Sequence, residues 1–188
     1  MFKHAIVALA VVLVAGVGSA FAQTSSQAAH PRFDVFGGLS FLPSDELDDF
    51  PRADSTGFQI TATWHANRWF GVFFDLGGHY STNADLGPGF PGQVAETSVY
   101  EILVGPRFTF GGERAHVFVH ALIGSCKGIT NIGFSDSGGT FGGGGGVDVD
   151  LTRRLAVRGQ FDYFGSFADI VDVNTRFAVG LVLKLGTQ

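Results

Sequence analysis

The feature that most constrains the fold is an alternation of charged and apolar residues at period two, clearest in RLAVRGQFDYF, residues 154–164. Successive side chains of a β-strand point to opposite faces. One face of this segment is therefore apolar, and the other carries Arg158, Gln160 and Asp162. Either the apolar face lies in a protein core and the charges meet water, or lipid covers the apolar face and the charges lie inside.

The same alternation recurs along the chain and predicts eight strands. They are residues 32–42, 57–65, 69–80, 97–110, 116–123, 141–151, 154–164 and 175–185. A strand of about ten residues crosses a bilayer at a tilt. The connections after the second, fourth and sixth strands are short, whereas the others are longer and polar, about ten to fifteen residues. Such alternation between short turns and long loops is typical of outer-membrane barrels. We therefore predict an all-β fold, an eight-stranded antiparallel up-and-down transmembrane β-barrel.

Alternation alone does not decide whether water or lipid covers each face, because soluble barrels such as lipocalins alternate with the opposite polarity. Over all eight segments one face carries almost no ionisable residues, and charged residues make up only 15% of the chain. An open sheet that exposed this face to water would aggregate. A barrel closed in lipid satisfies every backbone hydrogen-bonding group. The sequence therefore favours lipid on the apolar face, with a soluble secreted lipid carrier as the competing class.

Aromatic residues gather at the ends of the predicted strands. If the first strand runs outward, the three tyrosines of the chain lie on the apolar face near the outer interface, and further aromatics lie on that face near the opposite end. Aromatic girdles form where lipid meets water. The predicted lipid-interface aromatics are Trp64, Phe70, Tyr80, Tyr100, Phe108, Phe110 and Tyr163.

The interior of an eight-stranded barrel is just wide enough for side chains to fill it. The ionisable residues on the inward faces are Asp34, Asp75, Glu101, Arg107, Asp148, Asp150, Arg158, Asp162, Arg176 and Lys184. Buried charges need partners, so we predict a paired network that plugs the lumen. A three-residue turn at 152–154 would place Asp148 opposite Arg158. The alternative is a narrow ion-conducting, porin-like path.

The N-terminus has the pattern of a secretory signal. Lys3 and His4 precede an apolar run at 5–17, which is shorter than a membrane helix of about 20 residues. Ala20-Phe21-Ala22 then fits a small-x-small cleavage site. We expect residues 1–22 to be removed and residues 23–188 to form the barrel domain.

Cys126 is the only cysteine, which excludes an intrachain disulfide. The net charge of −5 does not suggest a nucleic-acid partner.

Candidate sites in the chain favour a non-enzymatic protein without metal or cofactor. His116 and His120 would be about 13 Å apart along a strand, too far to chelate one ion. The triplet His79-Tyr80-Ser81 is similar to the H-x-S fragment of outer-membrane lipid A deacylases, which keeps a lipid-modifying enzyme as an alternative, but the alternation points His79 inward. We expect Cys126 to be an incidental thiol in the third long loop.

The glycine run of the sixth predicted strand and the carboxylates of the first long loop both have structural explanations. The run 142–146, five glycines, lacks the Lys-Ser/Thr of a phosphate loop. We expect it to make room for bulky interior neighbours and to let the strand bend. The first long loop holds five carboxylates, without the spacing of an EF-hand calcium site. A solvated acidic loop is the favoured interpretation.

Three phrases, AHVFVHALIG, RLAVRGQFDYF and TRFAVGLVLKLG, together with the signal peptide, resemble the outer membrane protein beta-barrel family, which is related to the transmembrane domain of OmpA-like porins. The resemblance covers essentially all of the mature chain. It implies a bacterial outer-membrane location, contact with outer-membrane lipid, insertion by the barrel-assembly machinery and a structural role in envelope integrity. Surface loops could bind an extracellular ligand or support adhesion. Family members often end in an aromatic residue, whereas this chain ends LKLGTQ.

Overall fold

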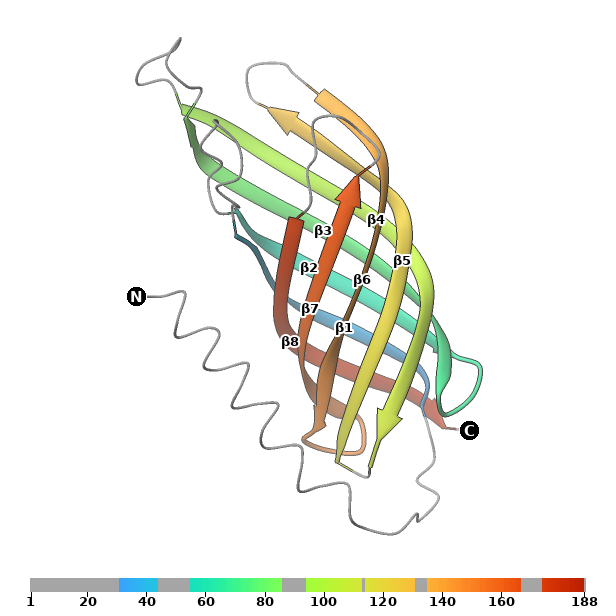
Figure 1. Ribbon diagram of the computed structural model, residues 1–188. Coiled ribbons are helices and arrows are strands. Elements are labelled where there is room, and N and C mark those ends of the chain that lie inside the picture. Colours follow the sequence, from blue (N-terminus) through green and yellow to red (C-terminus); the bar gives the residue numbers. More distant parts are fainter. Residues whose placement is uncertain are drawn as a thin grey trace.

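The computed structural model describes residues 31–43, 55–85, 94–112, 114–130, 135–166 and 174–187. These residues form eight antiparallel strands in one closed barrel, which confirms the predicted fold class. The strands are β1 (Pro31–Leu42), β2 (Ser55–His65), β3 (Phe70–Asp85), β4 (Val94–Gly111), β5 (Ala115–Thr130), β6 (Ser135–Asp150), β7 (Leu155–Ser166) and β8 (Asn174–Thr187). Figure 1 shows them as one tilted wall, with the three short connections at the end where the C-terminus lies.

Each strand pairs with its neighbours in the chain, and β1 closes the barrel by pairing with β8. In that closing pair Asp34 lies opposite Lys184 and Leu39 opposite Val179. Closure leaves no unpaired sheet edge, so the backbone groups of the wall are satisfied within the barrel. Among the described residues there is no helix that is long and apolar enough to cross a membrane.

The two faces of the wall have the polarity that the alternation predicts. Large apolar side chains point outward, such as Leu39, Ile102 and Val179, which are 74%, 65% and 58% exposed. The inward positions are buried and hold most of the polar side chains, among them three arginines that are at most 1% exposed. A barrel with an apolar exterior and a charged interior is the opposite of a soluble barrel in water.

The strands extend beyond the apolar alternation at the long-loop end. β3 continues to Asp85, β5 continues to Thr130, and β6 begins at Ser135 instead of Phe141. The expectation that Cys126 lies in a loop is therefore wrong: it lies within β5, is 4% exposed and has its Sγ 3.8 Å from the carbonyl oxygen of Gly138. These strand ends are polar, so hydrophobic periodicity does not detect them although the backbone pairing continues.

Trp69 is the first residue of the predicted strand 69–80, and alternation with the outward Phe70 would place it on the inward face. It lies in the turn at 66–69 before β3 and is 49% exposed. The turn is fixed by Asn67, whose side-chain oxygen accepts hydrogen bonds from the backbone N–H groups of Trp69 and Phe70 at 3.0 and 2.9 Å. Since the chain reverses here, the period of two does not extend to Trp69, and its ring stacks on Phe108 with centroids 6.0 Å apart.

Candidate functional site

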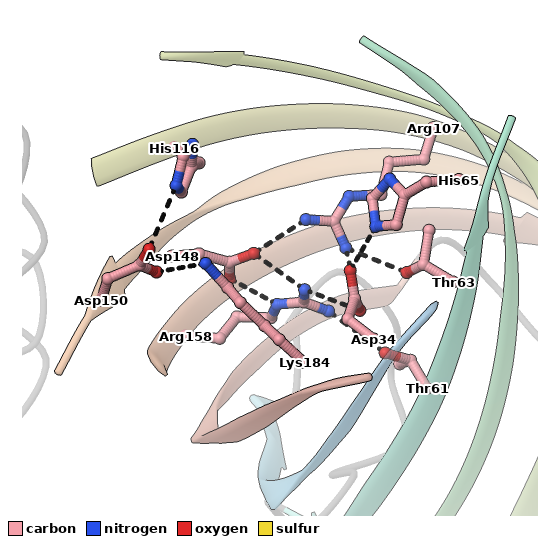
Figure 2. A network of polar contacts seen from close by, with 10 residues as sticks. All are labelled: Asp34, Thr61, Thr63, His65, Arg107, His116, Asp148, Asp150, Arg158 and Lys184. Atoms are coloured by element: carbon pink, nitrogen blue, oxygen red, sulfur yellow. Dashed lines mark hydrogen bonds and ion pairs between the residues drawn. The ribbon is translucent and has the colours of Figure 1, made fainter. Parts of the chain in front are cut away.

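The barrel interior nearest the short connections holds a ring of alternating charges, here called the short-turn network (Asp34, Arg107, Asp148 and Arg158; Figure 2). Asp148 receives hydrogen bonds from Arg158 Nε at 2.6 Å and from Arg107 Nη2 at 2.8 Å. Asp34 Oδ1 lies 3.3 Å from Arg158 Nη2 and 3.7 Å from Arg107 Nη1. Two carboxylates and two guanidiniums thus form a closed, charge-balanced set.

Neighbouring side chains add further hydrogen bonds to this network, although Arg107 Nε is buried without a partner among the described groups. Thr63 Oγ1 accepts from Arg107 Nη1 at 3.1 Å, and Thr61 Oγ1 accepts from Arg158 Nη1 at 3.2 Å. His65 Nε2 lies 2.6 Å from Asp34 Oδ2. Figure 2 shows that these side chains converge from opposite walls of the barrel. Pairing of these charges matters because a buried charge without partners is strongly destabilising.

A small outer group lies beside the short-turn network. Lys184 Nζ donates to Asp150 Oδ1 at 2.5 Å, and His116 Nε2 lies 3.4 Å from Asp150 Oδ2. Asp150 and Lys184 are half-buried, unlike the arginines of the network. Ion pairs that reach solvent contribute little to stability, so this group is expected to add little to the stability of the barrel.

A layer of aromatic rings separates the interior charges into two sets. Phe36, Phe73 and Phe118 are fully buried. The Arg107 guanidinium carbon lies 3.8 Å from the centroid of the Phe118 ring, and that of Arg158 lies 4.7 Å from it. On the other side, the Phe73 ring stacks on the imidazole of His120 at 4.7 Å. Cation–π contact of this kind stabilises desolvated guanidiniums.

Toward the long-loop end, the described residues place three carboxylates around a single guanidinium, here called the loop-side network (Asp75, Glu101, Asp162 and Arg176). Arg176 donates to Glu101 Oε2 at 2.8 Å and to Asp162 Oδ2 at 2.7 Å through its two Nη atoms, and it forms a short contact with Asp75. Its side chain is fully buried. This network, unlike the other, has more carboxylates than guanidiniums.

Neutral groups surround the loop-side carboxylates. Gln59 Nε2 donates to Asp75 at 2.7 Å, and Gln160 Nε2 donates to Asp162 at 2.9 Å. His120 Nε2 lies 2.8 Å from Asp162 Oδ1. The predicted set of ionisable interior residues omitted His120 and His65, and the neutral Gln59 and Gln160 fell outside it because it was limited to ionisable groups. The signal was present, because all four residues lie on the inward faces that the alternation defines.

The ten interior residues predicted from the sequence all lie on the inner face, in the two networks and the outer group. Cross-strand pairing places Asp148 opposite Arg158, in the register that a three-residue turn predicts. Glu101 and Arg107, both from β4, contribute to different networks: Glu101 contacts Arg176, and Arg107 contacts Asp148.

The aromatics predicted for the lipid interfaces lie on the outer face. Trp64, Tyr80, Tyr100, Phe110 and Tyr163 are exposed. Phe70 and Phe108 are half-buried because their rings contact each other at 5.4 Å. Tyr80 and Tyr100 meet edge to face at 6.1 Å near the long-loop end.

The histidine and serine of the H-x-S triplet point into the lumen. His79 is fully buried, and its Nε2 lies 2.7 Å from Ser40 Oγ. Its Nδ1 has no hydrogen-bond partner among the described groups, so no acid orients the ring as a catalytic triad requires. Ser81 is buried as well and does not face lipid. In the described part of the chain no group of three or more His, Cys, Asp or Glu side chains could hold a metal ion.

Three inward glycines of β6 supply the space that these bulky interior groups occupy. A Cβ atom at Gly142 would lie 2.4 Å from the Phe164 ring, one at Gly144 2.3 Å from Asp162 Oδ1, and one at Gly146 2.7 Å from the Phe118 ring. The glycine run therefore makes room inside the barrel, as the sequence predicts.

Gly144→Ala is expected to destabilise the barrel by about 1–3 kcal/mol, because the new Cβ atom would lie 2.3 Å from both Asp162 Oδ1 and the backbone carbonyl oxygen of Phe161, so the carboxylate and the neighbouring strand would both have to shift. Urea unfolding in lipid vesicles, followed by tryptophan fluorescence, measures the change. Gly159→Ala is the control, since a Cβ atom there meets nothing within 4 Å. Equal effects of the two substitutions would contradict the assigned role of Gly144.

A closed eight-stranded barrel with an apolar outer belt, aromatic ends and an ion-paired lumen defines the class of small outer-membrane barrels. The chain matches the outer membrane protein beta-barrel domain family over residues 9–184, and it belongs to that family. The comparison with curated protein sequences finds no match.

Solved structures with similar folds come from several bacteria. Neisserial surface protein A (NspA) has a TM-score of 0.64 at 13% identity, over 81% of this chain and 97% of that chain. OprG of Pseudomonas aeruginosa has a TM-score of 0.60 at 14% identity, over 85% and 99%. Ail, the attachment invasion locus protein of Yersinia pestis, has a TM-score of 0.56 at 14% identity, over 83% and 99%. At these identities the likeness concerns the fold.

Proposed function

We propose that this protein is a sealed structural barrel of the bacterial outer membrane, which contributes to envelope integrity and presents its long loops for adhesion or ligand binding. The observation that carries the proposal is the filled lumen. Arg107, Arg158 and Arg176 reach across the interior and are each held by at least two acceptors. With these side chains in place the interior is a packed polar core and not a water-filled channel.

The route to the membrane follows from the sequence. Residues 1–22 act as a cleaved secretory signal, residues 23–188 form the barrel domain, and the barrel-assembly machinery inserts it among outer-membrane lipids. In the orientation that outer-membrane barrels adopt, the short connections face the periplasm and the long loops face the exterior. The seven interface aromatics anchor the barrel at the two lipid–water boundaries.

The loops are the part of the barrel that could meet a partner. Ail is named for attachment and invasion, and we propose a comparable display role for the loops of this chain, with no nucleic acid, metal or cofactor involved. Binding of labelled cells or matrix to bacteria that express the protein, compared with bacteria that express a version with shortened loops, tests this role. Equal binding would contradict it.

The sealed lumen predicts that the purified barrel in a planar bilayer gives no large steady current at neutral pH and moderate salt. The reason is that an eight-stranded barrel is just wide enough for side chains to fill it, and here the two networks and the aromatic layer occupy the interior. Large steady openings would contradict the plug. Small cation-selective currents would instead support the narrow-channel alternative, because the loop-side network has an excess of carboxylates.

The lipid-modifying alternative has its own measurement. Mass spectra of lipid A from cells with and without the protein are expected to be identical, because His79 and Ser81 are buried and lie away from lipid. A shift equal to the loss of an acyl chain would contradict the non-enzymatic proposal.

A further inference from the structure

The three short connections share a feature that the lumen does not explain: each carries arginine. Arg68 lies in the first connection, Arg114 in the second, and Arg153 and Arg154 in the third. All four side chains are exposed, and among the described residues no carboxylate forms an ion pair with them. Glu113 is the only acidic residue in these connections and lies outside the described residues. The three connections together therefore carry a formal charge of +3.

Backbone hydrogen bonds fix each short connection to a neighbouring strand of the barrel. Thr109 N–H donates to the carbonyl oxygen of Trp69 at 2.9 Å, which ties the first connection to β4. Asp150 N–H donates to the carbonyl oxygen of Arg114 at 2.8 Å, and Lys184 N–H donates to that of Arg154 at 2.9 Å. Each connection is thus held against the adjacent strand, and the three connections lie at one end of the barrel (Figure 1).

Tryptophan side chains mark the depth of this end of the barrel in the membrane. The chain has two tryptophans: Trp64 lies beside the first short connection, and Trp69 lies within it. Trp64 and Trp69 are 41% and 49% exposed. Tryptophan is enriched at the level of lipid headgroups. Guanidiniums at the same level meet phosphate, which they bind through paired N–H donors.

The opposite end of the barrel has the reverse charge. The four connections at that end, residues 43–54, 86–93, 131–134 and 167–173, contain seven carboxylates and one arginine, Arg52. If the barrel attracted anionic lipid at both ends, basic residues would be expected at both ends. Because the basic residues of the connections are concentrated at the short-turn end, we assign the attraction for anionic lipid to that end alone.

We propose that this short-turn rim, formed by Arg68, Arg114, Arg153, Arg154, Trp64 and Trp69, binds anionic phospholipid headgroups. Basic clusters next to a membrane-spanning segment attract anionic lipid over a Debye length. The rim thereby selects the phospholipids that surround the barrel and holds its depth in the leaflet, independently of what the loops bind.

Tryptophan quenching by brominated lipid tests the proposal, because both tryptophans report from this rim. The full mature barrel is reconstituted in phosphatidylcholine vesicles that contain either brominated phosphatidylglycerol or brominated phosphatidylcholine at equal mole fraction. We expect the brominated anionic lipid to bind about threefold more strongly in low salt and the preference to vanish near 1 M salt. Equal quenching by the two lipids in low salt would overturn the proposal.

Matched variants locate the effect. R68Q/R114Q/R153Q/R154Q is expected to abolish the preference, and R68Q/R114Q to remove most of it, because both tryptophans lie at the first connection. R52Q/K127Q removes the same charge as the double variant, but outside the rim, and is expected to keep the full preference. Heat-modifiable gel migration shows that each variant is folded. A preference that survives in the fourfold variant, or that the control pair removes equally, would overturn the proposal.

Discussion

Replacing Arg176 with methionine is expected to lower the free energy of unfolding by about 3–5 kcal/mol. Arg176 is fully buried and is the guanidinium that contacts Asp75, Glu101 and Asp162. Methionine fills much of the same volume but leaves these carboxylates without their cation. The carboxylates are 1%, 6% and 0% exposed, so water in the native barrel does not compensate for the loss.

Urea unfolding in lipid vesicles measures this effect, and two further variants define its cause. Lys184→Met removes a cation from a half-buried pair with Asp150 and is expected to cost less than about 1 kcal/mol. The variant R176M/D75N/E101Q/D162N removes the carboxylate charges together with the guanidinium. We expect it to be more stable than R176M, because no unpaired charge then remains in the network. If R176M were no more destabilised than K184M, the loop-side network would not stabilise the barrel.

The expected hierarchy follows from burial, which the sequence shows only in outline. Alternation places Arg176 and Lys184 on the same inward face of β8, and in sequence they look equivalent. They differ because Arg176 lies deep in the barrel while Lys184 lies near the short-turn end, where solvent reaches its partner Asp150. Position along the barrel axis thus separates a strongly stabilising cation from a weakly stabilising one.

The pairs across the lumen could not be predicted from local pattern. Asp148 and Arg158 are cross-strand neighbours on β6 and β7, so turn length alone predicts their contact. Arg158 and Asp34 come from β7 and β1, which do not pair with each other, and are 124 residues apart in sequence. Their contact depends on the stagger with which the sheet closes, a property of all eight strand registers together. Periodicity therefore predicts which residues are inside, and closure decides which of them meet.

The strand ends escaped prediction for a related reason. Hydrophobic alternation reports where a strand faces hydrocarbon, whereas backbone pairing continues into polar surroundings. Cys126 and Lys127 lie in such an extension of β5, paired with Gly138 and Ser137 of β6. An interior position for Cys126 follows from continuing the inward parity of His120 and Leu122 along the strand, but only once the strand is known to continue.

Exchanging the charges of one cross-strand pair, D148R/R158D, is expected to destabilise the barrel by about 3–5 kcal/mol instead of preserving its stability. If Asp148 and Arg158 formed an isolated pair, the exchange would keep their attraction. In the short-turn network each has a second partner: Asp148 contacts Arg107, and Arg158 contacts Asp34. After the exchange, an arginine at position 148 faces Arg107 and an aspartate at position 158 faces Asp34, so two attractions become repulsions.

The fourfold exchange D34R/R107D/D148R/R158D separates this explanation from a general intolerance of substitution. It restores the alternation of charge around the ring, and we expect it to recover part of the stability that D148R/R158D loses, limited by the different lengths of the side chains and by the lost contact of Arg107 with the Phe118 ring. Urea unfolding of the wild type and both variants in the same vesicles provides the comparison. Full stability of the twofold exchange would show that Asp148 and Arg158 act as an isolated pair. A ring of four coupled charges is instead destabilised when two members are reversed and regains stability when all four are reversed.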